Sequence, residues 1–246
     1  MTAQGLDVEL PVHIDRQPNY TTCGPTSLHA LYRYFGDDIS LEQTIREVRQ
    51  HDVGGGTVSV HLAVHALQRG YDTTMWVSNV NYWDPTWFQQ PTDLLAKLKA
   101  RFEAKKWSAS ERHVIAMKAL ETYFGHGGKV VWGDLDPARI GNVLSQRLPI
   151  LAGTNGVYLY QCMRETDSGP NDITGDPYGH FIVVCGYRES DQSVSVADPL
   201  MDNPAHGTKY YRASVYRLIG SIFLGASSDD ANCLVIHPKN WEQRSA

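Results

Sequence analysis

The chain has 246 residues, of which 42% are hydrophobic and 20% charged, the composition of an ordinary globular protein with a sizeable core. Its 22 Lys and Arg against 27 Asp and Glu give a formal net charge of −5 without a long block of like charge, so nothing favours nucleic acid as a partner. The first residues, up to Asp7, carry acid where a signal peptide would be basic, and no stretch reaches the length of a membrane span. We therefore expect a cytoplasmic protein that does not enter a membrane.

The first predicted helix runs from Cys23 to Gly36. Its apolar residues recur at helical spacing: Leu28, Leu31, Tyr32 and Phe35. Pro25 has no backbone N–H and is tolerated only in the first turn of a helix. Cys23 must therefore lie at the helix N-terminus, where the positive end of the helix dipole favours a thiolate.

The rest of the N-terminal half is also expected to be mainly helical, apart from a strand at Tyr71–Val77 and an aromatic tract at 79–88. The sequence from Ser40 to Gln43 has the pattern of a capping box, which starts a helix. The further predicted helices are 40–50, the segment from the glycine loop at 54–57 to 70, 92–107, 110–124 and 136–147.

Beyond Pro149 the pattern changes to short strands that are separated by Gly, Pro, Asp or Ser clusters. The predicted strands are Ile150–Gly153, Val157–Cys162, His180–Tyr187, Val194–Ala197 and Cys233–His237. Helices followed by sheet, with no internal repeat and no linker, indicate a single α+β domain over residues 1–246. Its N-terminal helices are expected to pack on a C-terminal antiparallel sheet.

Four residues match the parts that a thiol nucleophile needs, which are a lowered pKa, a base, a group that orients the base and donors for an oxyanion. Cys23 is the candidate nucleophile, and Gln17, six residues upstream, can bring its side-chain amide to the same place. His180 begins a strongly apolar strand, where a polar residue is costly unless it is hydrogen-bonded or functional. The return strand brings Asp198 back toward His180, whose ring it can then hold.

The same residues carry a resemblance to a known family. Gln17 before Cys23-Gly-Pro, Gly56-Thr57 before a helix, Gly179-His180-Phe181 and Asp198-Pro199 resemble the double-glycine, bacteriocin-processing peptidase-like family of papain-fold cysteine peptidases. The resemblance implies a papain-like fold, with residues 76–136 as an apparent insertion. Its best-known members are fused to an export transporter and cut leader peptides after paired glycines. This chain is expected to be a soluble, stand-alone member that shares the chemistry.

The resemblance also implies a role for each candidate residue. Cys23 attacks, His180 is general base and then acid, Asp198 orients His180, and Gln17 supplies the oxyanion hole. The leading interpretation is a cysteine peptidase that cleaves a peptide or isopeptide bond of a peptide or protein substrate through a thioester that water resolves. The runner-up is a papain-fold acyltransferase or transpeptidase with an amine or thiol acceptor, and the third interpretation is a catalytically inactive peptide-binding module.

Other features have less specific interpretations. His61 and His65 are one helical turn apart, but the Glu of an HExxH motif is missing, so neither a metal nor another cofactor is expected. The remaining cysteines, 162, 185 and 233, are expected to be structural, poorly reactive thiols. The acidic loop 167–176 is either solvated or attracts a basic segment or a cation. The aromatic tract either lines a substrate groove or anchors the insertion.

Overall fold

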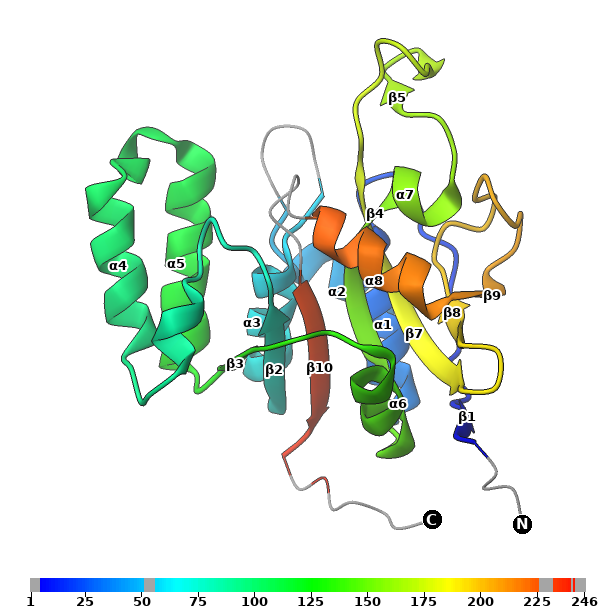
Figure 1. The fold of residues 1–246 in the computed structure, drawn as a ribbon, viewed down its shortest axis with the longest axis horizontal. Coiled ribbons are helices and arrows are strands. Elements are labelled where there is room, and N and C mark those ends of the chain that lie inside the picture. Colours follow the sequence, from blue (N-terminus) through cyan, green and yellow to red (C-terminus); the bar gives the residue numbers. More distant parts are fainter. Residues whose placement is uncertain (1–4, 51–55, 226–231, 240, 242–246) are drawn as a thin grey trace.

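A central, mostly antiparallel sheet forms the middle of this computed structural model, which describes residues 5–50, 56–225, 232–239 and 241 (Figure 1). Within those residues the sheet has eight strands, in the order β3-β2-β10-β4-β7-β8-β9, and β1 pairs with β7 beside this path. The strands of the sheet are β1 (Asp7–Glu9), β2 (Tyr71–Val77), β3 (Lys129–Trp132), β4 (Ile150–Asn155), β7 (Gly179–Arg188), β8 (Ser193–Ala197), β9 (Tyr210–Ser214) and β10 (Asn232–Pro238). A separate hairpin pairs β5 (Glu165–Thr166) with β6 (Gly169–Pro170). The β2–β3 pair is parallel, whereas the other pairs are antiparallel.

Two helices begin where the sequence predicts capping residues. Ser40 accepts a hydrogen bond from the backbone of Gln43, and Asp136 accepts one from Arg139, at the starts of the second and sixth helices. The helices are α1 (Cys23–Tyr34), α2 (Leu41–Glu47), α3 (Ser59–Gln68), α4 (Leu94–Ala104), α5 (Glu111–Gly125), α6 (Pro137–Ser145), α7 (Gly156–Tyr160) and α8 (Val215–Leu224), with 3-10 turns η1 (Pro85–Phe88) and η2 (Trp107–Ala109). The predicted α+β class, with N-terminal helices on a mostly antiparallel sheet, is confirmed.

Helices cover both faces of the sheet (Figure 1). α1 packs against β7, and α3 packs on β2 and β10, while α8 crosses β4 in front of the sheet in this view. β4 is buried along its whole length because helices lie on either side of it. The α4–α5 hairpin stands at the edge of the sheet beyond β3, next to α3.

Two predictions about local structure need correction. Val157–Cys162 was expected to be a strand, but residues 156–160 form α7, because Asn155 caps the turn by accepting a hydrogen bond from Tyr158 N at 3.0 Å. A short apolar run has no periodicity that separates strand from helix, so the cap decides. β9 and α8, which follow one another directly along the chain, are further elements that were not predicted. Gly54 of the predicted glycine loop lies outside the described residues.

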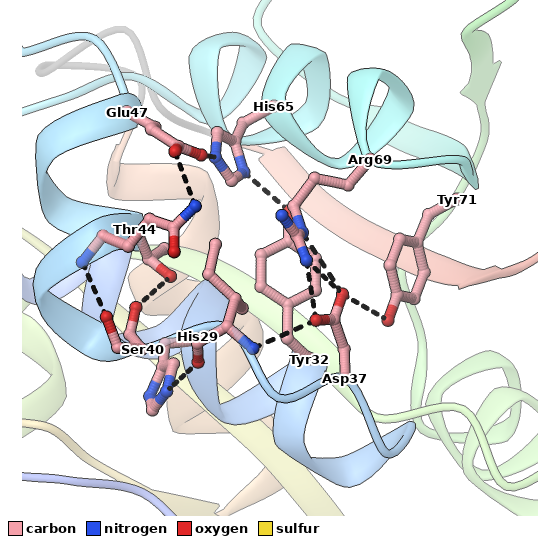
Figure 2. Close-up of polar contacts among 11 residues, drawn as sticks. His29, Tyr32, Asp37, Ser40, Thr44, Glu47, His65, Arg69 and Tyr71 are labelled. Atoms are coloured by element: carbon pink, nitrogen blue, oxygen red, sulfur yellow. Dashed lines mark hydrogen bonds and ion pairs between the residues drawn. The ribbon is translucent and has the colours of Figure 1, made fainter.

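A buried polar network fixes the three N-terminal helices relative to one another (Figure 2). His65 on α3 hydrogen-bonds through Nδ1 to the Tyr32 hydroxyl of α1 at 2.8 Å, and its Nε2 lies 3.2 Å from Glu47 of α2. Arg69 binds both oxygens of Asp37, at 2.7 and 2.9 Å from Nη2. Because each contact joins two different segments, α1 is held in one position, and with it the residue at its N-terminus.

Within the described residues no helix is both long and apolar enough to span a membrane. No group of three or more His, Cys, Asp and Glu side chains in the same residues is arranged to hold a metal ion.

Candidate active site

Cys23 is the first residue of α1, and close packing holds this end of the helix against the start of β7. Pro25 is the third residue of the helix, where no intrahelical partner for an N–H is needed. A Cβ on Gly24 would lie 2.6 Å from Thr57 Cγ2 and 3.2 Å from the Phe181 ring, so glycine permits this approach. The Ser27 hydroxyl donates to the Phe181 carbonyl at 3.2 Å. Cys23 therefore lies beside the first residues of β7.

His180 is the second residue of β7, and β4 and β8 position it from its two sides. The Thr154 hydroxyl of β4 donates to the His180 carbonyl oxygen at 2.8 Å, which fixes the strand at this point. Asp198 directly follows β8, and its Oδ1 lies 2.9 Å from His180 Nε2. Both side chains are buried, with Asp198 fully inaccessible and His180 5% exposed. The structure thus brings the two residues together across the β7–β8 pair.

Burial and a charged partner act in opposite directions on His180. Burial by itself lowers the pKa of His180. The charge and hydrogen bond of Asp198, with a smaller effect of the Cys23 side chain, outweigh burial and raise the pKa of His180 to about 10. Burial also raises the pKa of Asp198, and the charge and hydrogen bonds around it prevail and hold that pKa below its usual value. The pair is therefore stabilised in its charged form, with Cys23 as the further neighbour of the ring.

Asp198 accepts hydrogen bonds from three donors besides His180. The Tyr160 hydroxyl donates to Oδ2 at 2.6 Å and the Tyr211 hydroxyl at 2.8 Å, while the backbone N–H of Leu200 donates to Oδ1 at 2.8 Å. A buried carboxylate needs such donors because it has lost its water. Sequence reasoning missed both tyrosines, since one lies on α7, which was predicted as a strand, and the other lies on β9, which was not predicted.

Gln17 is held in the loop before α1 and lies against the segment that follows Asp198. Its backbone N–H donates to the Pro199 carbonyl at 3.0 Å, and its side-chain Nε2 donates to the Asn19 carbonyl at 2.9 Å. The side chain is buried, with 8% of the residue exposed. A primary amide has two N–H groups, so one donor of Gln17 remains beyond the bond to Asn19.

The other cysteines differ from Cys23 in their surroundings. Burial raises the pKa of Cys185 and of Cys233 to about 12, which keeps both thiols protonated near neutral pH. Cys162 is half-buried, and its sulfur lies 3.7 Å from the Tyr178 hydroxyl. All four cysteines are free thiols.

A family model described as the Peptidase_C39 like family matches residues 6–222 of the chain, a range that contains Gln17, Cys23, His180 and Asp198. The chain belongs to the Peptidase_C39 like family. The resemblance predicted from the motifs is thus confirmed at the level of the family. At the level of the family, the function is of the cysteine peptidase type, with peptides or proteins as substrates.

Two solved structures are similar to this C39-like chain. The peptidase domain of Streptococcus ComA, a bifunctional ABC transporter of a quorum-sensing pathway, is 14% identical, with a TM-score of 0.44 over 93% of this chain and 99% of that chain. A protein described as a C39-like peptidase of Bacillus anthracis is 15% identical, with a TM-score of 0.43 over 95% of this chain and 98% of that chain. No curated protein sequence matches the chain significantly.

Removal of the Tyr160 hydroxyl is expected to destabilise this C39-like chain, because that hydroxyl donates a hydrogen bond to the buried Asp198. Tyr160→Phe leaves Oδ2 of the buried Asp198 with the Tyr211 hydroxyl as its remaining side-chain donor, and a hydrogen bond to a charged group is worth about 1.5–3 kcal/mol. We expect the free energy of unfolding in urea to fall by about that amount. Tyr20→Phe is the matched control, because Tyr20 is 91% exposed. An equal effect of the two substitutions would contradict the assigned role of the Tyr160 hydroxyl.

Proposed function

We propose that the protein is a cysteine peptidase that cleaves a peptide or isopeptide bond through a thioester on Cys23. The observation that carries the proposal is the buried His180–Asp198 pair, with 2.9 Å between His180 Nε2 and Asp198 Oδ1, at the start of β7, against which the N-terminal end of α1 with Cys23 is packed. A nucleophile, a base within reach and a group that orients the base are the parts that this chemistry requires. Family membership supports the same class of reaction.

In the proposed reaction, Cys23 and His180 share one proton. The Cys23 sulfur attacks the substrate carbonyl as a thiolate, which forms the S–C bond, and the proton resides on His180. The C–N bond then breaks, and His180 gives its proton to the leaving amine. Water attacks the thioester, His180 takes one proton from it, and the acid product leaves as the Cys23 sulfur is released. Asp198 holds the ring through Nε2, which leaves Nδ1 to face the sulfur.

The oxyanion of each tetrahedral intermediate needs donors that are already in place. We assign this role to the backbone N–H of Cys23, at the N-terminus of α1, and to the Gln17 side-chain amide. Two bonds support the assignment: the backbone N–H of Gln17 donates to the Pro199 carbonyl and fixes the loop, and its side-chain Nε2 donates to the Asn19 carbonyl, which leaves one amide N–H for a substrate. The assignment of residues 76–136 as an insertion into one catalytic domain is part of the same proposal.

Product analysis tests the proposal directly. The protein is incubated with a peptide library, with and without an added amine such as glycinamide, and the products are identified by mass spectrometry. We expect free carboxylic acid termini to form in both conditions. Products that carry the added amine in place of the acid would support an acyltransferase, while no turnover of any peptide would favour a binding module. A library of amide-linked lysine side chains separates isopeptide from peptide cleavage.

A further inference from the structure

A cavity of about 390 Å³ lies at the opposite end of α1 from Cys23. Four separate parts of the chain line it, namely the loop after β1, the C-terminal end of α1, the α6–β4 connection and the C-terminal segment at Trp241. α1 has 12 residues, so about 18 Å of helix separates this cavity from the candidate nucleophile. Its volume falls in the range of small-molecule sites, which is roughly 300–1,000 Å³.

One side of the cavity is aromatic. The rings of Phe35 and Trp241 meet edge to face at a centroid distance of 5.3 Å, and Tyr34 packs edge to face on Phe35 at 5.0 Å. The Nε1 atom of Trp241 is buried and has no hydrogen-bond acceptor among the described residues. The part of Trp241 that lines the cavity, together with Phe35 and Tyr34, therefore offers aromatic apolar area to a ligand.

The other side of the cavity is basic. Arg33, Arg147 and His13 line it, and the described lining residues include no Asp or Glu. Arg33 is partly neutralised by Asp15, whose carboxylate lies 3.2 Å from Nη1. Burial raises the pKa of Tyr34. The positive charge of Arg147 acts in the opposite direction on this pKa, because it lies near the Tyr34 hydroxyl, but its effect is smaller than that of burial.

Arg147 is held in place by its backbone. The Tyr34 hydroxyl donates to the Arg147 carbonyl at 3.0 Å, and Arg147 has a φ of 59°, in the left-handed region that non-glycine residues rarely adopt. Arg147 is exposed and lines a cavity whose described lining contains no acid, although the chain as a whole has a net charge of −5. Guanidinium groups match carboxylate and phosphate oxygens through paired hydrogen bonds.

We propose that this cavity binds a small anionic ligand whose carboxylate or phosphate is attached to an aromatic ring. The anion contacts Arg147 and Arg33, and the ring lies against Phe35 and Trp241. The site is separate from the proposed peptidase chemistry and needs no activity for its test.

Isothermal titration calorimetry with phenyl phosphate and with benzoate tests the proposal on the 246-residue chain. We expect at least one of the two probes to bind, and the stronger one identifies the anion as phosphate or carboxylate. Arg147→Gln and Trp241→Leu are each expected to weaken that binding by about tenfold or more. Arg147→Gln removes a hydrogen bond to the charged group, and Trp241→Leu removes an aromatic contact with the ring. Arg46→Gln on α2 is the matched control, because Arg46 is exposed and lies outside the cavity lining.

Three results would overturn the proposal. The first is the absence of heat with both probes on folded wild-type protein at millimolar concentration. The second is unchanged affinity in both cavity variants. The third is equal binding of inorganic phosphate or of benzyl alcohol, because either would show that the anion and the ring are not recognised together. Thermal unfolding of each variant checks the fold, and Arg33→Gln replaces Arg147→Gln if that variant does not fold.

Discussion

Cys23→Ala is expected to abolish peptide cleavage and to leave the fold intact. The sulfur is the atom that forms the bond to the substrate, and removal of the nucleophile of a comparable triad lowers kcat by about 10⁶-fold. The fold should persist because alanine is small and favourable in a helix. The hydrogen bonds of α1 are made by backbone atoms, which the substitution leaves in place. Cleavage rates of a substrate from the peptide library, with circular dichroism for the fold, measure the two effects.

Cys162→Ala is the matched control for this substitution, because Cys162 is half-buried and therefore the most accessible of the other cysteines, whereas Cys23, Cys185 and Cys233 are buried. It should retain wild-type activity. Labelling with iodoacetamide gives a second readout, because fast modification of a single thiol should disappear in Cys23→Ala and persist in Cys162→Ala. Retained cleavage in Cys23→Ala would refute the proposed function as a whole.

Asp198→Asn is expected to reduce activity by about 10²–10⁴-fold rather than to abolish it, as for the orienting carboxylate of a comparable triad. The amide can still hold the His180 ring in place but no longer carries the negative charge that favours the protonated ring. Without that charge, the largest of the causes that raise the pKa of His180 is removed, while burial still acts to lower it. Loss of one partner of a buried ion pair should also lower the free energy of unfolding by about 3–5 kcal/mol.

The same pair makes stability depend on pH in a defined direction. The pKa of His180 is raised from 6.5 to about 10 in the folded protein, so its contribution is complete below pH 6.5 and is lost as pH rises toward 10. The pKa of Asp198 is held below 3.8, so its contribution is present above pH 3.8 and is lost as pH falls below that value. The pair should therefore stabilise the fold most between about pH 4 and 6.5.

Urea unfolding at pH 6 and at pH 10 measures this effect. The difference between the two pH values should be larger in the wild type than in Asp198→Asn, which has no charged pair to lose. Asp202→Asn is the matched control, because Asp202 forms an exposed ion pair with Arg16 at 2.7 Å, and such pairs contribute little. The interpretation fails if Asp198→Asn keeps the wild-type dependence on pH.

Local sequence signals determined where the candidate nucleophile lies. Pro25 and the helical spacing of the apolar residues placed Cys23 at the start of α1, because both signals act within a few residues. The strand that begins near His180 and the return strand before Asp198 were also predictable. An antiparallel pair joined by a short turn brings its two ends together without help from the rest of the chain.

Contacts between distant segments were decided by the tertiary structure. Tyr160 and Tyr211 reach Asp198 because the fold brings α7 and β9 to the same place, and neither element has a sequence pattern that indicates its partner. The position of β10 between β2 and β4 likewise depends on sheet order rather than on local propensity. The sequence by itself therefore determined the position of the candidate nucleophile and the pairing of its two candidate partners in a short hairpin. Only the folded chain decided the surroundings of the carboxylate, because burial and long-range donors arise when remote elements pack together.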